Sequence, residues 1–160
     1  MLDQKGYRVA PVSAENLQEV TALRANLEVM AFAKSIENGD DRWEDALVAS
    51  YHRLKRMEES ASKGVQFDGW DQAHRTFHIT LFSASGMPLL LQFCNTLHDL
   101  SDRYRRLFLA TNAHDRDVPA EHKAILDAAI ARDKELACDL LRQHIERTGK
   151  NLFVILPTKD

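Results

Sequence analysis

The feature that most restricts how this chain can fold is a helical repeat of apolar residues that runs through almost its whole length. In the stretch 14–37, apolar residues recur every three or four positions, at Leu17, Val20, Leu23, Leu27, Met30 and Ala31. This spacing places them on one face of an α-helix. Similar patterns predict further helices over about 42–62, 68–85, 88–110, 119–132 and 133–154.

Residues that start or stop helices lie between these stretches. Ser13 and Asp133 can cap helix N-termini, and Gly64 and Gly86 can end helices. The intervening loops are short, and no strand pattern follows residue 12. The sequence therefore predicts an all-α fold, an antiparallel helical bundle of six or seven helices that occupies residues 13–160 as one domain.

Residues 1–12 differ from the rest because Gly6–Val12 alternates in a β-like pattern. A strand this short cannot form a sheet by itself. We therefore expect this stretch to belong to a structure whose remainder lies outside the chain.

Composition excludes several classes of protein. The 160 residues carry a net charge of −3, so the chain lacks the basic excess that drives binding to nucleic acid. No apolar run is long enough to span a membrane, and the N-terminus lacks a signal-peptide pattern, so a cytoplasmic protein is expected. Cys94 and Cys138 lie in helical apolar stretches, which favours reduced core thiols.

Four histidines occupy positions where the helical pattern calls for apolar residues. His74 and His78 are four residues apart and share one helix face, and His122 and His144 lie on the inward stripes of later helices. A single buried histidine is commonly just hydrogen-bonded in a core. Four of them on three helices would leave many polar atoms to satisfy, which a shared metal ion would do. His98 can also face inward, whereas His52 and His114 are expected at the surface.

This nitrogen-rich set suits a divalent transition metal rather than magnesium or calcium. Zinc is the first choice, with nickel, manganese or iron as alternatives. Spacing alone does not decide between a closed tetrahedral site and a six-coordinate site with room for a ligand.

A metal among neutral ligands leaves net positive charge, which favours an organic anion as a second guest. Arg24 and Arg105 lie near the inward faces of their helices and could each hold a carboxylate by paired hydrogen bonds. The alternative for each is an ion pair between helices or an arginine that extends to solvent.

The order of these features resembles a known family. The matching elements are Arg24-Ala25-Asn26-Leu27-Glu28, His74-Arg75-Thr76-Phe77-His78, Ser83-Ala84-Ser85-Gly86, Glu121-His122 followed by Ala128-Ala129-Ile130, and His144. Over residues 13–150 they resemble the C-terminal effector-binding domain of GntR-type transcription regulators of the FadR subfamily. Within it they are similar to the subgroup of carbon-starvation-induced repressors of glutarate and 4-aminobutyrate catabolism.

The resemblance implies an all-helical domain that dimerises and binds a divalent metal and a small carboxylate or dicarboxylate. It also implies that a winged helix-turn-helix domain precedes this one, with residues 1–12 as a remnant of its wing. DNA would then be bound only through that absent domain. The chain departs from the family pattern at His74, where the family usually has an aspartate. Asp71 could substitute as a ligand or support one through a hydrogen bond.

These observations predict an effector-sensing domain of a bacterial repressor rather than an enzyme. In this interpretation the metal is held by His74, His78, His122 and His144, and the effector by Arg24 and Arg105. The chief alternative is a metal-dependent hydrolase on a helical bundle, although only Glu121 offers a general base beside the histidines. A third is a bundle with a purely structural metal and an interaction role.

Overall fold

The computed structural model describes residues 12–61, 67–108 and 116–156, and these parts of the chain form helices joined by short turns. The six helices are α1 (Ala14–Asn38), α2 (Asp41–Ala61), α3 (Phe67–Phe82), α4 (Pro88–Phe108), α5 (Val118–Ile130) and α6 (Lys134–Ile155). The predicted all-α fold is confirmed. The predicted stop at Gly64, the surface position of His114 and all of residues 1–11 lie outside the described residues.

Short polar side chains begin the helices where the sequence predicted them. The Ser13 hydroxyl accepts a hydrogen bond from the Asn16 N–H at 3.0 Å at the start of α1. The Asp133 carboxylate accepts one from the Leu136 N–H at 3.2 Å at the start of α6. Each contact satisfies one of the backbone donors that a helix N-terminus leaves free.

The third helix ends earlier than predicted, at Phe82 instead of Ser85. The chain turns over Ser83–Gly86, where the Ser85 N–H bonds to the Phe82 carbonyl at 3.1 Å. Gly86 has a φ of 70°, a backbone conformation that side chains with a Cβ rarely adopt. This glycine therefore allows the sharp turn into α4.

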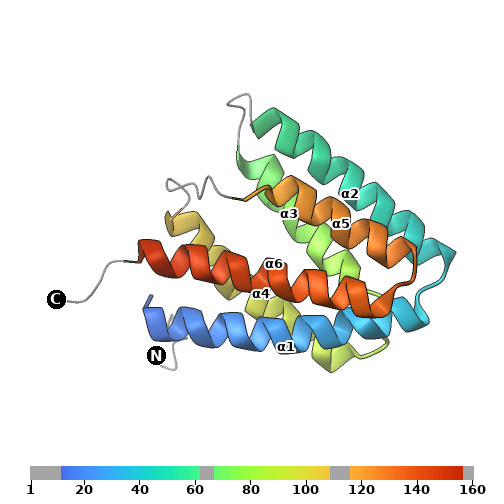
Figure 1. Ribbon diagram of the computed structural model, residues 1–160, viewed down its shortest axis with the longest axis horizontal. Coiled ribbons are helices and arrows are strands. Elements are labelled where there is room, and N and C mark those ends of the chain that lie inside the picture. Colours follow the sequence, from blue (N-terminus) through green and yellow to red (C-terminus); the bar gives the residue numbers. More distant parts are fainter. Residues whose placement is uncertain (1–11, 62–66, 109–115, 157–160) are drawn as a thin grey trace, which may run out of the picture.

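The helices alternate in direction along the chain, as an antiparallel bundle requires (Figure 1). Helix α1 packs against α6 and α4, α3 packs against α2, and α5 packs against both α6 and α2. This arrangement turns the inward faces of α3, α5 and α6 toward one another. None of the described helices is long and apolar enough to cross a membrane.

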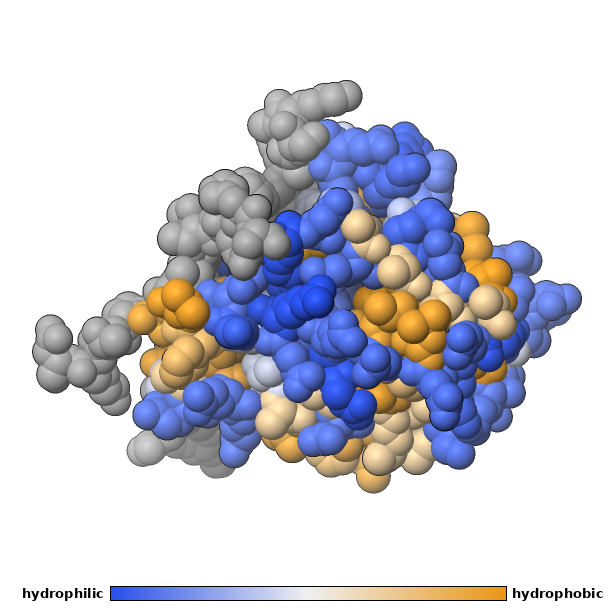
Figure 2. Space-filling model, viewed as in Figure 1, coloured by the Kyte–Doolittle hydropathy of each residue, from blue (hydrophilic) through white to orange (hydrophobic). Residues whose placement is uncertain are grey.

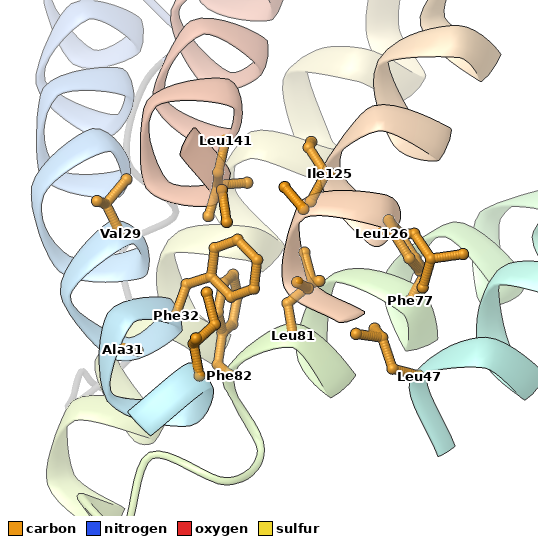
Figure 3. Close-up of a cluster of buried hydrophobic side chains, with 14 of the residues drawn as sticks. Val29, Ala31, Phe32, Leu47, Phe77, Leu81, Phe82, Ile125, Leu126 and Leu141 are labelled. Atoms are coloured by element: carbon orange, nitrogen blue, oxygen red, sulfur yellow. The ribbon is translucent and has the colours of Figure 1, made fainter. Parts of the chain in front are cut away.

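Large apolar side chains from these packed helices meet in a shared hydrophobic core (Figure 3). Phe32 of α1, Leu81 and Phe82 of α3, Ile125 of α5 and Leu141 of α6 are almost completely buried. Burying a side chain of this size stabilises the fold by about 1.5–3 kcal/mol. On the face seen in Figure 2, hydrophilic residues cover most of the surface, with apolar groups between them.

Neither cysteine forms a disulfide. Burial raises the pKa of the Cys94 thiol to about 12, so this thiol stays protonated at neutral pH. This agrees with the predicted reduced core thiol.

Gly149 of α6 packs closely against Thr21 of α1. A Cβ at this position would lie 2.4 Å from the Thr21 hydroxyl oxygen and 2.6 Å from the Thr21 methyl carbon. Thr21 is β-branched and cannot easily move aside. A side chain at position 149 would therefore push the two helices apart.

We expect Gly149→Ala to lower the free energy of unfolding by about 1–2 kcal/mol, because overpacking outweighs the gain in helix propensity. Adding Thr21→Ala should restore most of that loss, which urea unfolding of the two single variants and the double variant would measure. Equal losses in Gly149→Ala and in the double variant would contradict this account of the α1–α6 contact.

Candidate metal centre

The structure brings the four predicted histidines together inside the bundle. His74 and His78 come from α3, His122 from α5 and His144 from α6, and all four are buried. One ring nitrogen from each lies within 4.8 Å of those from the other three. Zinc–nitrogen bonds of about 2.0–2.1 Å place tetrahedral ligands about 3.4 Å apart, so a modest inward shift would close a site.

Buried ring nitrogens without partners test whether these residues fit a metal. Both ring nitrogens of His78 and both of His122 lack hydrogen-bond partners among the described residues. Leaving such polar atoms buried and unpaired destabilises a fold, and a metal ion would satisfy one nitrogen of each ring. The residues therefore fit a transition metal that prefers nitrogen ligands.

Carboxylates lie behind two of the four rings. The Nδ1 atom of His144 is 2.8 Å from a carboxylate oxygen of Glu121, so it can donate its hydrogen outward and leave Nε2 free for a metal. The Nδ1 atom of His122 is 3.5 Å from an oxygen of Glu58. Glu121 therefore orients a histidine, which is a different role from the general base considered for a hydrolase.

Arg116 holds Glu121 in place. Its Nε donates to Glu121 Oε2 at 2.9 Å, and its Nη1 donates to the Thr148 hydroxyl at 3.1 Å. Burial alone would raise the pKa of Glu121, but hydrogen bonds from Arg116 and His144 outweigh it and hold that pKa well below its usual range. Glu121 is therefore ionised and remains an acceptor for His144.

A different group lies behind His74. Arg105 Nη1 is 3.1 Å from His74 Nδ1, and Arg105 Nη2 bonds to Asp71 at 2.9 Å. Asp71 contacts Arg105 and Arg106 and belongs to none of the potential metal-ligand groups in the described chain. Its link to His74 runs through Arg105.

His98 is a fifth buried histidine and faces inward from α4, as the sequence allowed. Its Nδ1 is 3.4 Å from an Asp102 carboxylate oxygen, and its ring lies 5.2 Å from that of His78. His52 is exposed on α2, as predicted.

Arg24 is buried and already paired. Its Nε donates to Glu28, one turn along α1, and its Nη1 donates to the Ser101 hydroxyl at 2.9 Å. Glu28 is fully buried and, with His78 and His98, forms a further group of closely spaced potential ligands. The structure therefore places Arg24 next to the histidine cluster, linked to it through Glu28.

Sequence reasoning missed several groups that support the cluster. Glu58 follows Leu54 by four residues and Tyr51 by seven, so the helical pattern of α2 could have placed it on the inward face. Asp102 follows the inward His98 by one turn in the same way. Arg116 precedes α5 and carries no periodic signal, so only the folded structure reveals its role.

Burial disfavours the charged form of these histidines. It lowers the pKa of His74 and His78 well below the usual value, with further lowering by Arg105 at His74 and by His144 at His78. Burial also lowers the pKa of His144 to about 3, although Glu121 acts in the opposite direction. All three rings are neutral at pH 7, which metal binding requires.

These shifts predict that the metal-free protein loses stability in mild acid. Below a pH of about 6.5 the unfolded chain binds protons at these three rings while the folded chain does not. We therefore expect the free energy of unfolding to fall between about pH 7 and pH 5, by at most about 1.4 kcal/mol per pH unit for each ring. Urea unfolding of chelator-treated protein would measure the slope.

His78→Leu should reduce that slope by the contribution of one ring, because one fewer proton is bound on unfolding. His52→Gln, on the exposed side of α2, should leave the slope unchanged. A stability that stays constant between about pH 7 and pH 5 would show that the rings are not held neutral.

Comparison with known proteins identifies the domain. Residues 19–147 match the FCD domain family. The chain is 40% identical over 145 residues to the HTH-type transcriptional regulator BphR of Paraburkholderia xenovorans (strain LB400), covering 89% of this chain and 59% of that protein. It is 34% identical over 149 residues to the HTH-type transcriptional repressor GlaR of Escherichia coli (strain K12), covering 91% of this chain and 68% of that protein.

Solved structures share the fold. McbR/YncC of E. coli superimposes with a TM-score of 0.78 at 22% identity, over 92% of this chain and 73% of that one. The metal-free FCD domain of TM0439 superimposes with a TM-score of 0.72 at 20% identity, over 91% of this chain and 96% of that one.

The family and both relatives are transcription regulators rather than enzymes, so the hydrolase alternative has no support. The chain belongs to the FCD-domain family of GntR-type transcription regulators.

Proposed function

We propose that this domain binds a divalent metal through His74, His78, His122 and His144 and senses a small carboxylate or dicarboxylate beside it. The observation that carries this proposal is the group of four buried imidazoles, with two rings lacking any hydrogen-bond partner among the described residues. Membership of a family of transcription regulators supplies the purpose, which is control of DNA binding.

Zinc is the metal we propose first, with nickel, manganese or iron as alternatives. An all-nitrogen set favours transition metals over magnesium and calcium. When bound, the metal would supply net positive charge that attracts an anion and offers it a coordination position. The outward hydrogen bond from His144 to Glu121 would hold that ring in the required tautomer.

Arg24 is the residue that we expect to hold the effector carboxylate. Among the described residues, its Nη1 donates to the neutral Ser101 hydroxyl, which a carboxylate would replace with a stronger charge-assisted bond. Its Nε stays on Glu28, which keeps the guanidinium aimed toward the cluster. Arg105 would provide a second cationic contact from the α4 side.

The effector can control DNA binding only if it favours one arrangement of the regulator over another. The chain spans 59% and 68% of its two curated relatives, both named as HTH-type proteins. We propose that a separate winged helix-turn-helix domain contacts DNA, and that residues 1–12 belong to its connection with this bundle. The assembled regulator would act as a cytoplasmic repressor.

We also propose that two copies of this domain associate. Leu23 and Met30 on α1 and Leu89 and Phe93 on α4 are exposed apolar residues, and α1 packs against α4. Exposed apolar residues gathered on neighbouring helices are typical of protein interfaces. A second copy would cover them.

The metal and effector sites can be separated by two substitutions. His78→Ala should abolish stoichiometric metal in the purified protein, as measured by elemental analysis, because it removes a ligand from the centre of the cluster. Arg24→Gln should retain the metal but weaken binding of succinate, glutarate or adipate by about 10- to 100-fold in calorimetric titration, since it removes a charged hydrogen-bond donor.

His52→Ala is the matched control, because it removes an exposed histidine of α2, and it should change neither measurement. No binding of any of the three dicarboxylates, with or without metal, would contradict the effector proposal. If metal removal unfolds the protein and no small acid binds, the metal is purely structural.

The dimer is tested by introducing charge on α4. Leu89→Glu combined with Phe93→Glu should convert the dimer to a monomer in size-exclusion chromatography with light scattering, because two carboxylates would be buried in the interface. Val48→Glu, at an exposed apolar position of α2, is the control and should remain dimeric. A wild-type protein that stays monomeric would contradict the proposal.

A further inference from the structure

Arg105 is held beside His74 by several contacts at once. Its Nη1 lies 3.1 Å from His74 Nδ1, and its Nη2 lies 2.9 Å from Asp71 and 2.8 Å from Asp102. The guanidinium also lies 5.0 Å from the centre of the Trp70 ring, which itself stacks on His74. These contacts make the guanidinium a fixed neighbour of one of the four imidazoles.

The chemistry of these two groups makes this contact incompatible with coordination by His74. A guanidinium has only donors and keeps its charge, so His74 Nδ1 must provide the lone pair. The neutral ring then carries its hydrogen on Nε2. A metal at Nε2 would move that hydrogen to Nδ1, where it would face the Arg105 donor, and a metal at Nδ1 would need the lone pair that Arg105 uses.

His144 shows the opposite arrangement. Its Nδ1 is 2.8 Å from a Glu121 oxygen, which accepts a hydrogen, whereas Arg116 is more distant at 3.4 Å. Glu121 therefore prepares His144 for a metal at Nε2, while Arg105 opposes a metal at His74. Two ligands of one cluster thus have outer partners of opposite kinds.

We propose that Arg105 and the metal compete for His74, and that metal binding displaces the Arg105 guanidinium from the ring. The displaced Nη1 then becomes available to an anionic ligand, so the metal-loaded domain presents a cation that the metal-free domain keeps occupied. This inference rests on the proposed metal and effector sites and adds their coupling. Because such coupling is reciprocal, the anion would also strengthen metal binding.

Zinc affinity of the purified metal-free chain, measured by competition with a chromophoric chelator, tests the competition. Arg105→Met should bind zinc about tenfold more tightly than the wild type, because it removes a charged donor from His74. The gain should disappear when Arg105→Met is compared with the wild type in a His74→Ala background. Arg106→Met is the matched control, since Arg106 bonds to the same Asp71 at 3.2 Å but is largely exposed.

Either of two results with Arg105→Met would overturn the proposal. One is unchanged or weaker zinc binding in Arg105→Met. The other is a gain that persists with His74→Ala, because the uncovered Asp71 and Asp102 carboxylates would then be its source. The zinc affinity of the Arg106→Met control should be unchanged. An equal gain in that control would also overturn the proposal, because loss of positive surface charge would then explain the effect.

A second measurement does not depend on metal binding. Long-range proton–nitrogen NMR correlations of the metal-free wild type should show His74 with its hydrogen on Nε2, and His144 with its hydrogen on Nδ1. A His74 hydrogen on Nδ1 would overturn the Arg105 contact. If the tautomers are as expected but the wild type binds no zinc, the proposed metal site fails while the contact stands.

Discussion

Five imidazole rings are buried inside the described part of this small bundle, and their nitrogens need partners that the protein supplies only in part. An apolar side chain at any of these positions would pack without leaving a polar atom unpaired. The fold instead carries a free-energy cost, because the ring nitrogens of His78 and His122 have no hydrogen-bond partner among the described residues. Such a cost persists in a stable domain when another component offsets it, and a metal ion among the rings would do so.

The charged residues around the rings are arranged in ion pairs. Arg24 pairs with Glu28, Arg116 pairs with Glu121, and Arg105 pairs with both Asp71 and Asp102. Each of these arginines is paired with at least one carboxylate, which offsets much of the charge that it would otherwise impose on the imidazoles. The pairs nevertheless differ in which member touches the ring, because Glu121 faces His144 whereas Arg105 faces His74.

The parts of the site that follow helical periodicity were predictable from the sequence. His74, His78, His122 and His144 replace apolar residues on inward faces, so their convergence follows once the fold is an antiparallel bundle. The caps at Ser13 and Asp133 likewise mark where helices begin. Periodicity does not show which partner an inward arginine selects, so the pairing of Arg24 with Glu28 and of Arg105 with Asp71 and Asp102 required the folded structure.

The nature of residue 74 decides how the α4 side of the cluster behaves. An aspartate, which the resembling regulators usually carry there, would be negative and would attract both the metal and Arg105. A carboxylate has enough acceptor sites to bind both at once. A neutral imidazole offers one lone pair, so His74 must exchange one partner for the other. With histidine at this position, the same arginine becomes a competitor of the metal, and occupancy of the metal site then sets whether Arg105 is available to an anion.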